Sequence, residues 1–285
     1  MIKTIMVTGA TSGIGLAVCR NLALAGYGII GVGRCEDKCV KAVSELRKRS
    51  PNTPIMFFSG DLMQQSQIFK IGSEIIKYLN DYCDGRLYAL INNVGCIRSY
   101  FSTTEEGYEQ QFALNHLTAF LLTHILMPYL VKSNGRILVT SSGSHKMTTV
   151  RWNDIMFKKR YNPLFAYKQS KLCNLLFVYA LNERFKICGI SAYGVDPGLV
   201  RTDIGLKQTN GLVKAVWKIR QKKGVSPEIP AKTYEFLCNE SKKPASLYYY
   251  LCKNQKYSKQ VNKNNADRLW DLSEKLCNIK FGKVE

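Results

Sequence analysis

Histidine and acidic residues are scarce in this 285-residue chain, which has 3 His and 21 Asp and Glu against 41 Lys and Arg. With so few histidines and no Cys/His cluster, we expect no metal site. The formal net charge of +20 fits nucleic acid, an anionic membrane surface or phosphorylated ligands as partners. Basic residues are spread along the chain with few interleaved aromatic clusters, so a solvated basic surface is favoured and no nucleic-acid partner is expected.

Long apolar runs and closely spaced cysteine pairs are also lacking. The longest apolar stretch, Ala119–Val131, is interrupted by polar residues and a proline, and a membrane span needs ~20 apolar residues. No secretory signal is visible. The ten cysteines lack the two-residue spacing of metal and redox motifs, which indicates reduced, mostly buried thiols. The sequence therefore predicts a cytoplasmic protein without a transmembrane anchor.

Short apolar runs alternate with longer amphipathic stretches along the chain, a pattern typical of a parallel sheet with helical crossovers. We expect one α/β domain over residues 1–285. Its fold is a single doubly wound Rossmann-type domain, with a mainly parallel sheet of about seven strands and helices on both faces. The predicted strands are Lys3–Thr8, Gly28–Val32, Pro54–Ser59, Leu87–Asn92, Gly135–Ser141, Ile190–Val195 and Ser246–Tyr250. The predicted helices are Gly13–Ala25, Glu36–Arg49, Gln64–Leu79, Thr104–Leu130 and Phe165–Phe185.

A glycine-rich turn follows the first predicted strand and opens the first helix. Gly9 suits the tight turn, Gly13 lets the backbone approach a pyrophosphate, and Gly15 lets helix and strand pack closely. The helix N-terminus offers free N–H groups and the positive end of its dipole to phosphates. We therefore predict a dinucleotide site, with Thr11, Ser12 and Ile14 in the same turn.

The end of the second strand bears on the choice of dinucleotide. An acidic residue there binds the ribose 2′-hydroxyl and favours NAD, but this strand ends at Gly33 and is followed by Arg34. A guanidinium suits a 2′-phosphate. The sequence thus predicts NADP(H) as the preferred cofactor. The alternative is NAD(H), in which case Arg34 is an ordinary surface arginine.

Polar and glycine residues follow the other strands, where parallel sheets bind ligands. Asp61 and Leu62 follow the third strand, although Asp61 could simply cap the next helix. Asn92 and Gly95 follow the fourth, and Pro197-Gly198 turns the chain outward after the sixth, where it can form a wall for a flat ring.

A tyrosine and a lysine lie four residues apart on one predicted helix face, at Tyr167 and Lys171. A nearby ammonium lowers the pKa of a phenol towards working pH, which suits acid–base catalysis. Ser142, after the fifth strand, can donate a hydrogen bond to a carbonyl oxygen. Asn115 is a poor helix former inside a predicted helix, so a hydrogen bond or a packing role is expected to keep it there.

Together these residues, in this order, resemble the short-chain dehydrogenase/reductase family from the first residues to about Thr202. The resemblance implies that Tyr167 donates or accepts the proton, while Lys171 lowers its pKa and holds the nicotinamide ribose. It also implies that Ser142, rather than Ser141, orients the substrate carbonyl and that Asn115 supports a proton relay. It assigns adenine contact to Asp61 and carboxamide contact to Thr202.

The branch of retinol dehydrogenases and WW-domain oxidoreductases is more similar still. It shares Asn115-His116-Leu117, the sequence around Tyr167, and Arg268-Leu269-Trp270-Asp271-Leu272-Ser273. The family usually has a lid after the sixth strand, which places a substrate lid at residues 206–223. These features predict carbonyl–alcohol interconversion on a bulky apolar ketone or aldehyde, of steroid, retinoid or lipid type. The alternative is a catalytically silent, cofactor-sensing or scaffold protein. A homo-oligomer is compatible with the sequence, which leaves the oligomeric state open.

Overall fold

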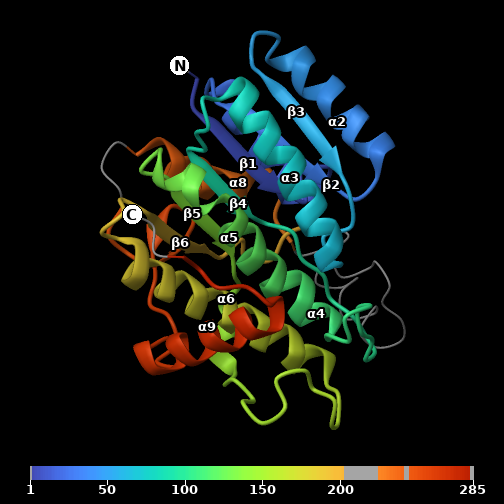
Figure 1. Ribbon diagram of the computed structural model, residues 1–285, viewed down its shortest axis with the longest axis vertical. Helices are drawn as coiled ribbons and strands as arrows, with labels where there is room; N and C mark the ends of the chain where they lie inside the picture. The colour runs from blue at the N-terminus through green and yellow to red at the C-terminus, as the bar shows by residue number, and fades with distance from the viewer. Residues whose placement is uncertain (1, 202–223, 241–243, 283–285) are drawn as a thin grey trace.

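The computed structural model describes residues 2–201, 224–240 and 244–282, and their strands form one sheet in the order β3-β2-β1-β4-β5-β6-β7-β8 (Figure 1). All neighbouring strands are parallel except β7 and β8, which are antiparallel. The strands are β1 (Thr4–Thr8), β2 (Gly28–Gly33), β3 (Ile55–Ser59), β4 (Ala89–Asn92), β5 (Arg136–Thr140), β6 (Ser191–Val195), β7 (Tyr248–Tyr250) and β8 (Lys253–Asn254).

The strand order reverses beside β1. The chain runs outward from β1 to β2 and β3, and then returns to place β4 against the other side of β1. Ile5 is therefore in register with Ile29 of β2 and with Ala89 of β4. Such a reversal leaves a crevice at the carboxyl ends of the two central strands, because their connections leave in opposite directions.

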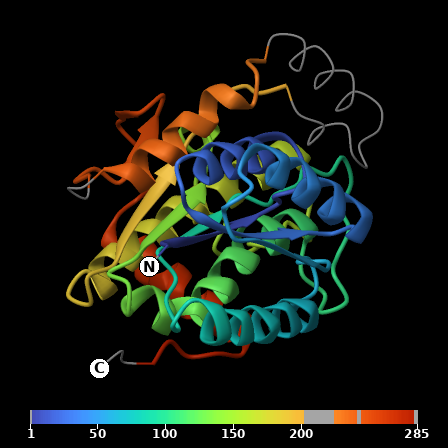
Figure 2. The ribbon, with the colours of Figure 1, turned by 90° about the horizontal axis from the view of Figure 1, so that it is seen from above.

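Helices cover both faces of the sheet, as the view from above shows (Figure 2). One layer contains α1 (Gly13–Leu24), α2 (Glu36–Arg49) and α8 (Glu228–Asn239), and α1 contacts both of the others. The opposite layer contains α3 (Gln65–Tyr82), α5 (Thr118–Val131) and α6 (Pro163–Phe185), with α9 (Lys263–Cys277) packed on α6. The predicted doubly wound α/β fold is confirmed.

The central strands β1, β2, β4 and β5 are buried at every residue because helices cover both faces of the sheet. In β1, Ile5, Met6 and Val7 are all fully buried. Met6 belongs to the core under α3, α5 and α6, whereas Ile5 and Val7 belong to the core under α1 and α8. Successive side chains of a strand point to opposite faces, so one short run supplies both cores.

The predicted helix Thr104–Leu130 is wrong at its N-terminus. Residues 104–107 form a turn, and the helix begins with α4 (Gln110–Phe112), where the Glu109 carboxylate accepts a hydrogen bond from Phe112 N. The segment Thr103-Thr104-Glu105-Glu106 has the composition of a capping sequence for the helix that follows it. Glu106 nevertheless accepts a hydrogen bond from Gln65 N at the start of α3. The capping chemistry was present in the sequence, but the chain folds the carboxylate onto a different helix.

The C-terminal part contains elements that periodicity alone did not predict, namely β8, α8 and α9. β8 has two residues and pairs only with the short β7, so its sequence carries little strand signal. The β7 strand itself is shorter than the predicted Ser246–Tyr250.

One described region, Gln110–Val131, is long and apolar enough to span a membrane, and 72% of its apolar window is buried inside the fold. That burial is typical of the core helix of a globular domain. Seven of the ten cysteines are buried and all ten are free thiols.

Candidate active site

The glycine-rich turn joins β1 to α1 with little space to spare. Gly9 and Gly13 have φ angles of +67° and +54°, in the region that favours glycine. A Cβ on Gly15 would lie 2.2 Å from Gly9 O, so α1 approaches the turn as closely as the sequence predicted. The Ser12 side chain forms no capping hydrogen bond, which leaves the first amides of α1 for an anion.

The loop after β4 is tied to the same turn by a threonine. Thr8 Oγ1 accepts hydrogen bonds from Asn93 N and Val94 N, both at 3.0 Å. Asn93 Nδ2 donates in return to Thr8 O at 3.0 Å. Neither Thr8 nor Asn93 was a predicted site residue, although both are polar residues at the ends of neighbouring parallel strands. They hold the two sides of the switch point together.

Asn92 lies below this edge of the sheet. Its side chain is 4% exposed and its Nδ2 donates to Thr123 Oγ1 of α5. The structure thus gives the Asn92 side chain a place in the core between sheet and helix.

The residues after β3 are also well fixed. Asp61 Oδ1 accepts a hydrogen bond from Met63 N at 3.1 Å in the turn before α3. Because α3 begins at Gln65, Asp61 does not cap that helix, and the capping role considered for it is wrong. Leu62 is buried and its carbonyl accepts from Thr118 Oγ1 at 2.7 Å. The adenine contact expected of Asp61 stays a prediction.

The end of β2 leaves no room for a carboxylate at residue 33. A Cβ on Gly33 would lie 2.3 Å from Thr11 Cγ2 and 2.9 Å from Cys39 Sγ. Arg34, the next residue, is exposed. The residue directly after this strand therefore carries a guanidinium.

The predicted acid–base pair stands in the first turns of α6. Lys171 Nζ lies 5.6 Å from the centroid of the Tyr167 ring and donates to Thr140 O at 3.0 Å. Lys171 is 2% exposed, and burial lowers its pKa to about 8. An ammonium this poorly solvated interacts strongly with nearby oxygens, because little water screens its charge.

The two adjacent serines after β5 face different surroundings. Ser141 is 1% exposed, and its hydroxyl donates to Lys171 O at 2.9 Å. Ser142 is half-buried, and its Oγ accepts hydrogen bonds from Ser144 N and Ser144 Oγ. The Ser141 hydroxyl therefore links β5 to α6, whereas the half-buried Ser142 is accessible at the edge of the sheet.

Asn115 lies in a π-helical turn, η1 (Ala113–Leu117), rather than in regular α-helix. Its Oδ1 accepts from Cys96 N at 2.7 Å, and its Nδ2 donates to Cys96 O and to Ser170 Oγ. A Cβ on Gly95 would lie 2.9 Å from Asn115 Oδ1 and 3.5 Å from Lys171 Nζ. Asn115 thus brings the loop after β4 beside the lysine. Ser170, which sequence analysis did not select, links it to the helix of the tyrosine.

Gly198 turns the chain after β6 with a φ of +69°. Gly198 N donates to Asp196 Oδ1, and Tyr248 OH donates to Asp196 Oδ2 at 2.7 Å. These bonds fix the Pro197-Gly198 wall. The predicted carboxamide contact Thr202 and the predicted lid 206–223 lie outside the described residues.

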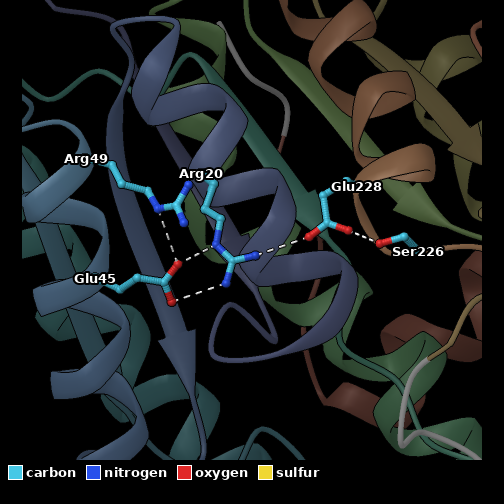
Figure 3. Close-up of polar contacts among 5 residues, drawn as sticks. All are labelled: Arg20, Glu45, Arg49, Ser226 and Glu228. Carbon is cyan, nitrogen blue, oxygen red and sulfur yellow. Dashed lines mark hydrogen bonds and ion pairs between the residues drawn. The ribbon is translucent and has the colours of Figure 1, made fainter.

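The residues on either side of that segment are held together. Arg201 N donates to Val225 O at 2.9 Å, and Val225 N donates to Leu199 O at 2.8 Å. Just beyond, Glu228 at the start of α8 pairs with Arg20 of α1, which also binds Glu45 of α2 (Figure 3). Arg20 therefore fixes α8 against the helix that begins at the glycine-rich turn.

A model of the short chain dehydrogenase family matches residues 3–211 of the chain. The chain belongs to this family. Mouse retinol dehydrogenase 12 is 31% identical over 98% of this chain and 87% of its own length. Human retinol dehydrogenase 13 is 31% identical over 99% of this chain and 86% of its own length. The short-chain dehydrogenase described here is an oxidoreductase of the retinol dehydrogenase branch, which confirms the resemblance seen in the sequence.

Solved structures agree with this assignment of the fold. An uncharacterised protein from Mycobacterium paratuberculosis superposes with a TM-score of 0.73 at 26% identity, covering 98% of this short-chain dehydrogenase and 95% of that chain. A short-chain dehydrogenase from Sphingobium yanoikuyae, solved with NADPH, superposes with a TM-score of 0.65 at 22% identity, covering 83% and 84%.

Proposed function

We propose that this enzyme interconverts a carbonyl and an alcohol with NADP(H) as its cofactor. The observation that carries the proposal is the buried Lys171 ammonium, 5.6 Å from the Tyr167 ring centroid at the sheet edge that also bears Ser142. A cation at that place favours the phenolate over the phenol, so Tyr167 can give or take a proton near neutral pH. Ser142 can donate a hydrogen bond to the same substrate oxygen.

The residues around the switch point fit a dinucleotide. The tight turn at Gly9 and Gly13 and the uncapped N-terminus of α1 suit a pyrophosphate. When bound, the nicotinamide supplies or accepts the hydride at the carbonyl carbon. In reduction Tyr167 then gives its proton to the carbonyl oxygen, and in oxidation it takes the hydroxyl proton.

The preference for NADP(H) is proposed from the end of β2. An adenine-ribose 2′-phosphate carries charge that an exposed guanidinium can hold through paired hydrogen bonds. Arg34 is such a group, and Gly33 has no space for the carboxylate that would select NAD. NAD(H) is expected to bind more weakly.

The proposed substrate is a bulky apolar aldehyde, ketone or alcohol, and retinoids are the first candidates because the similar proteins are named retinol dehydrogenases. We also propose, as the sequence predicts, that the enzyme is located in the cytoplasm.

The test is NADPH oxidation with a panel of retinaldehyde and aliphatic, aromatic and steroid ketones. Tyr167→Phe should lower turnover by about 10²–10⁴-fold while NADPH affinity stays within a few-fold, because only the transferable proton is lost. Tyr179→Phe, a half-buried tyrosine of the same helix, is the matched control and should keep wild-type turnover. If the protein binds NADPH but turns over none of the substrates, a catalytically silent cofactor sensor would be favoured instead. Wild-type turnover by Tyr167→Phe would refute the assigned proton donor.

A further inference from the structure

A pocket of about 450 Å³ lies next to the candidate active site. It is formed by η2 (Gly143–Met147), by the connection that leads to α6, and by the loop after β8. Its lining includes the cations Lys146 and Arg151 and the hydroxyl groups of Thr148 and Ser258. No carboxylate lines it among the described residues, so the pocket offers hydrogen-bond donors and positive charge to a ligand.

The arginine is held in place without an acidic partner. The Arg151 guanidinium lies 4.7 Å from the centroid of the buried Phe157 ring, and Arg151 N donates to Gln169 Oε1 at 2.8 Å. Within the described part of the chain neither Lys146 nor Arg151 forms an ion pair. Both charges are available to an anion from outside the molecule.

Apolar side chains project beside these cations. Met147 is 61% exposed, Phe165 43%, Leu164 41% and Tyr257 39%. Met147 follows Lys146 directly, Phe165 lines the pocket, and Tyr257 precedes the pocket residue Ser258. Exposed apolar groups among cations are the composition of surfaces that lie at a lipid interface.

The surrounding chain is strongly basic. Residues 143–168 carry six Lys and Arg and one acidic residue, and residues 251–262 carry three Lys and no acidic residue. The acidic residue, Asp154, accepts hydrogen bonds from Lys158 N and Lys159 N. These two segments, which supply the lining of the pocket, therefore carry nine of the 41 Lys and Arg residues and only one acidic residue.

We propose that this basic face docks on an anionic lipid surface, with a lipid phosphate in the pocket between Lys146 and Arg151. Clustered cations draw a protein to an anionic bilayer, and apolar side chains beside them then enter the interface. Because η2 begins directly after Ser142 and Phe165 stands two residues before Tyr167, the docked face lies next to the candidate active site. The proposal does not depend on the proposed function, since docking needs no turnover.

The test is co-sedimentation of the full chain with phosphatidylcholine vesicles, prepared with and without phosphatidylserine. The wild type should bind the phosphatidylserine vesicles, less so as salt is raised, and should not bind phosphatidylcholine alone. The double variant Lys146→Glu/Arg151→Glu should lower the partition coefficient at least tenfold, since each cation near the surface contributes about a fivefold factor.

The matched control is Lys41→Glu/Lys48→Glu on α2, where both lysines are exposed. It makes the same change in net charge at the other end of the molecule (Figure 1), and it should bind within about twofold of wild type, because charges beyond a Debye length of about 8 Å are largely screened. Phe165→Ser should weaken binding at constant charge. If the double reversal prevents folding, Lys146→Gln alone should lower binding about fivefold.

Any one of four results would overturn the proposal. The first three are absence of binding to phosphatidylserine vesicles, equal losses in the Lys146/Arg151 and Lys41/Lys48 variants, and equal binding to vesicles of phosphatidylcholine alone. Preferential capture of an oligonucleotide over vesicles would point to nucleic acid and would overturn it too.

Discussion

Removing the buried ammonium of Lys171 should make the protein more stable while it abolishes most of the activity. Lys171 is 2% exposed, and its ammonium donates to Thr140 O. Burial lowers its pKa to about 8, against about 10.4 for a lysine in an unfolded chain. At 1.36 kcal/mol per pKa unit, keeping this charge in the folded state costs about 3 kcal/mol.

Lys171→Met keeps a similar side-chain length and removes the charge. The carbonyl that loses its donor is not left unpaired, because Asn174 Nδ2 also donates to Thr140 O at 3.0 Å. Without cofactor at pH 7, the variant should therefore melt roughly 6 °C higher, at about 2 °C per kcal/mol for a domain of this size. The turnover of Lys171→Met should fall, as that of Tyr167→Phe does, because the Tyr167 phenol loses the cation that lowers its pKa.

The pH dependence has a definite sign. Below pH 8 the lysine is charged in both states, so the folded wild type carries the full cost. Between pH 8 and about 10.4 the folded state is neutral and the unfolded state still binds a proton, so wild-type stability rises with pH. The advantage of the variant should shrink over that window. The assay is thermal unfolding across pH, with the exposed Lys232→Met as control. A variant that melts below wild type at pH 7, or an advantage that does not change with pH, would refute the reasoning.

Three further predictions follow from the cofactor turn and the serines. Arg34→Ala should weaken NADPH binding roughly ten- to a hundredfold and leave NADH binding nearly unchanged, as measured by fluorescence titration of both cofactors; equal losses for both would contradict the 2′-phosphate assignment. Ser142→Ala should lower turnover about 10²–10³-fold in steady-state assays. Ser141→Ala should lower stability by about 1 kcal/mol in thermal melts and change turnover little. The reverse pattern would mean that Ser141, and not Ser142, acts on the substrate. Gly15→Ala should destabilise the fold by about 1–3 kcal/mol in chemical denaturation, because its Cβ would meet Gly9 O at 2.2 Å; an unchanged midpoint would mean that the turn can open.

The sequence by itself determined the layers of the fold and the place of the chemistry. Strands such as β1 (Thr4–Thr8) have a continuous apolar centre because they are buried on both faces, and that pattern can be recognised without any knowledge of contacts. The glycine-rich turn and the spacing of Tyr167 and Lys171 are likewise local. A turn and a helix face are set by residues a few positions apart, so the sequence alone predicts them.

Only the tertiary structure decided which partner each polar side chain takes. Glu106 looks like a cap for the helix that follows it, yet it caps α3. Asn115 looks like a poor helix residue, and its role appears only when Cys96 and Ser170 are brought against it. The two serines after β5 differ because one faces α6 and the other does not. These choices depend on residues distant in the chain, and hydrogen-bond partners across such distances are fixed by packing rather than by local spacing.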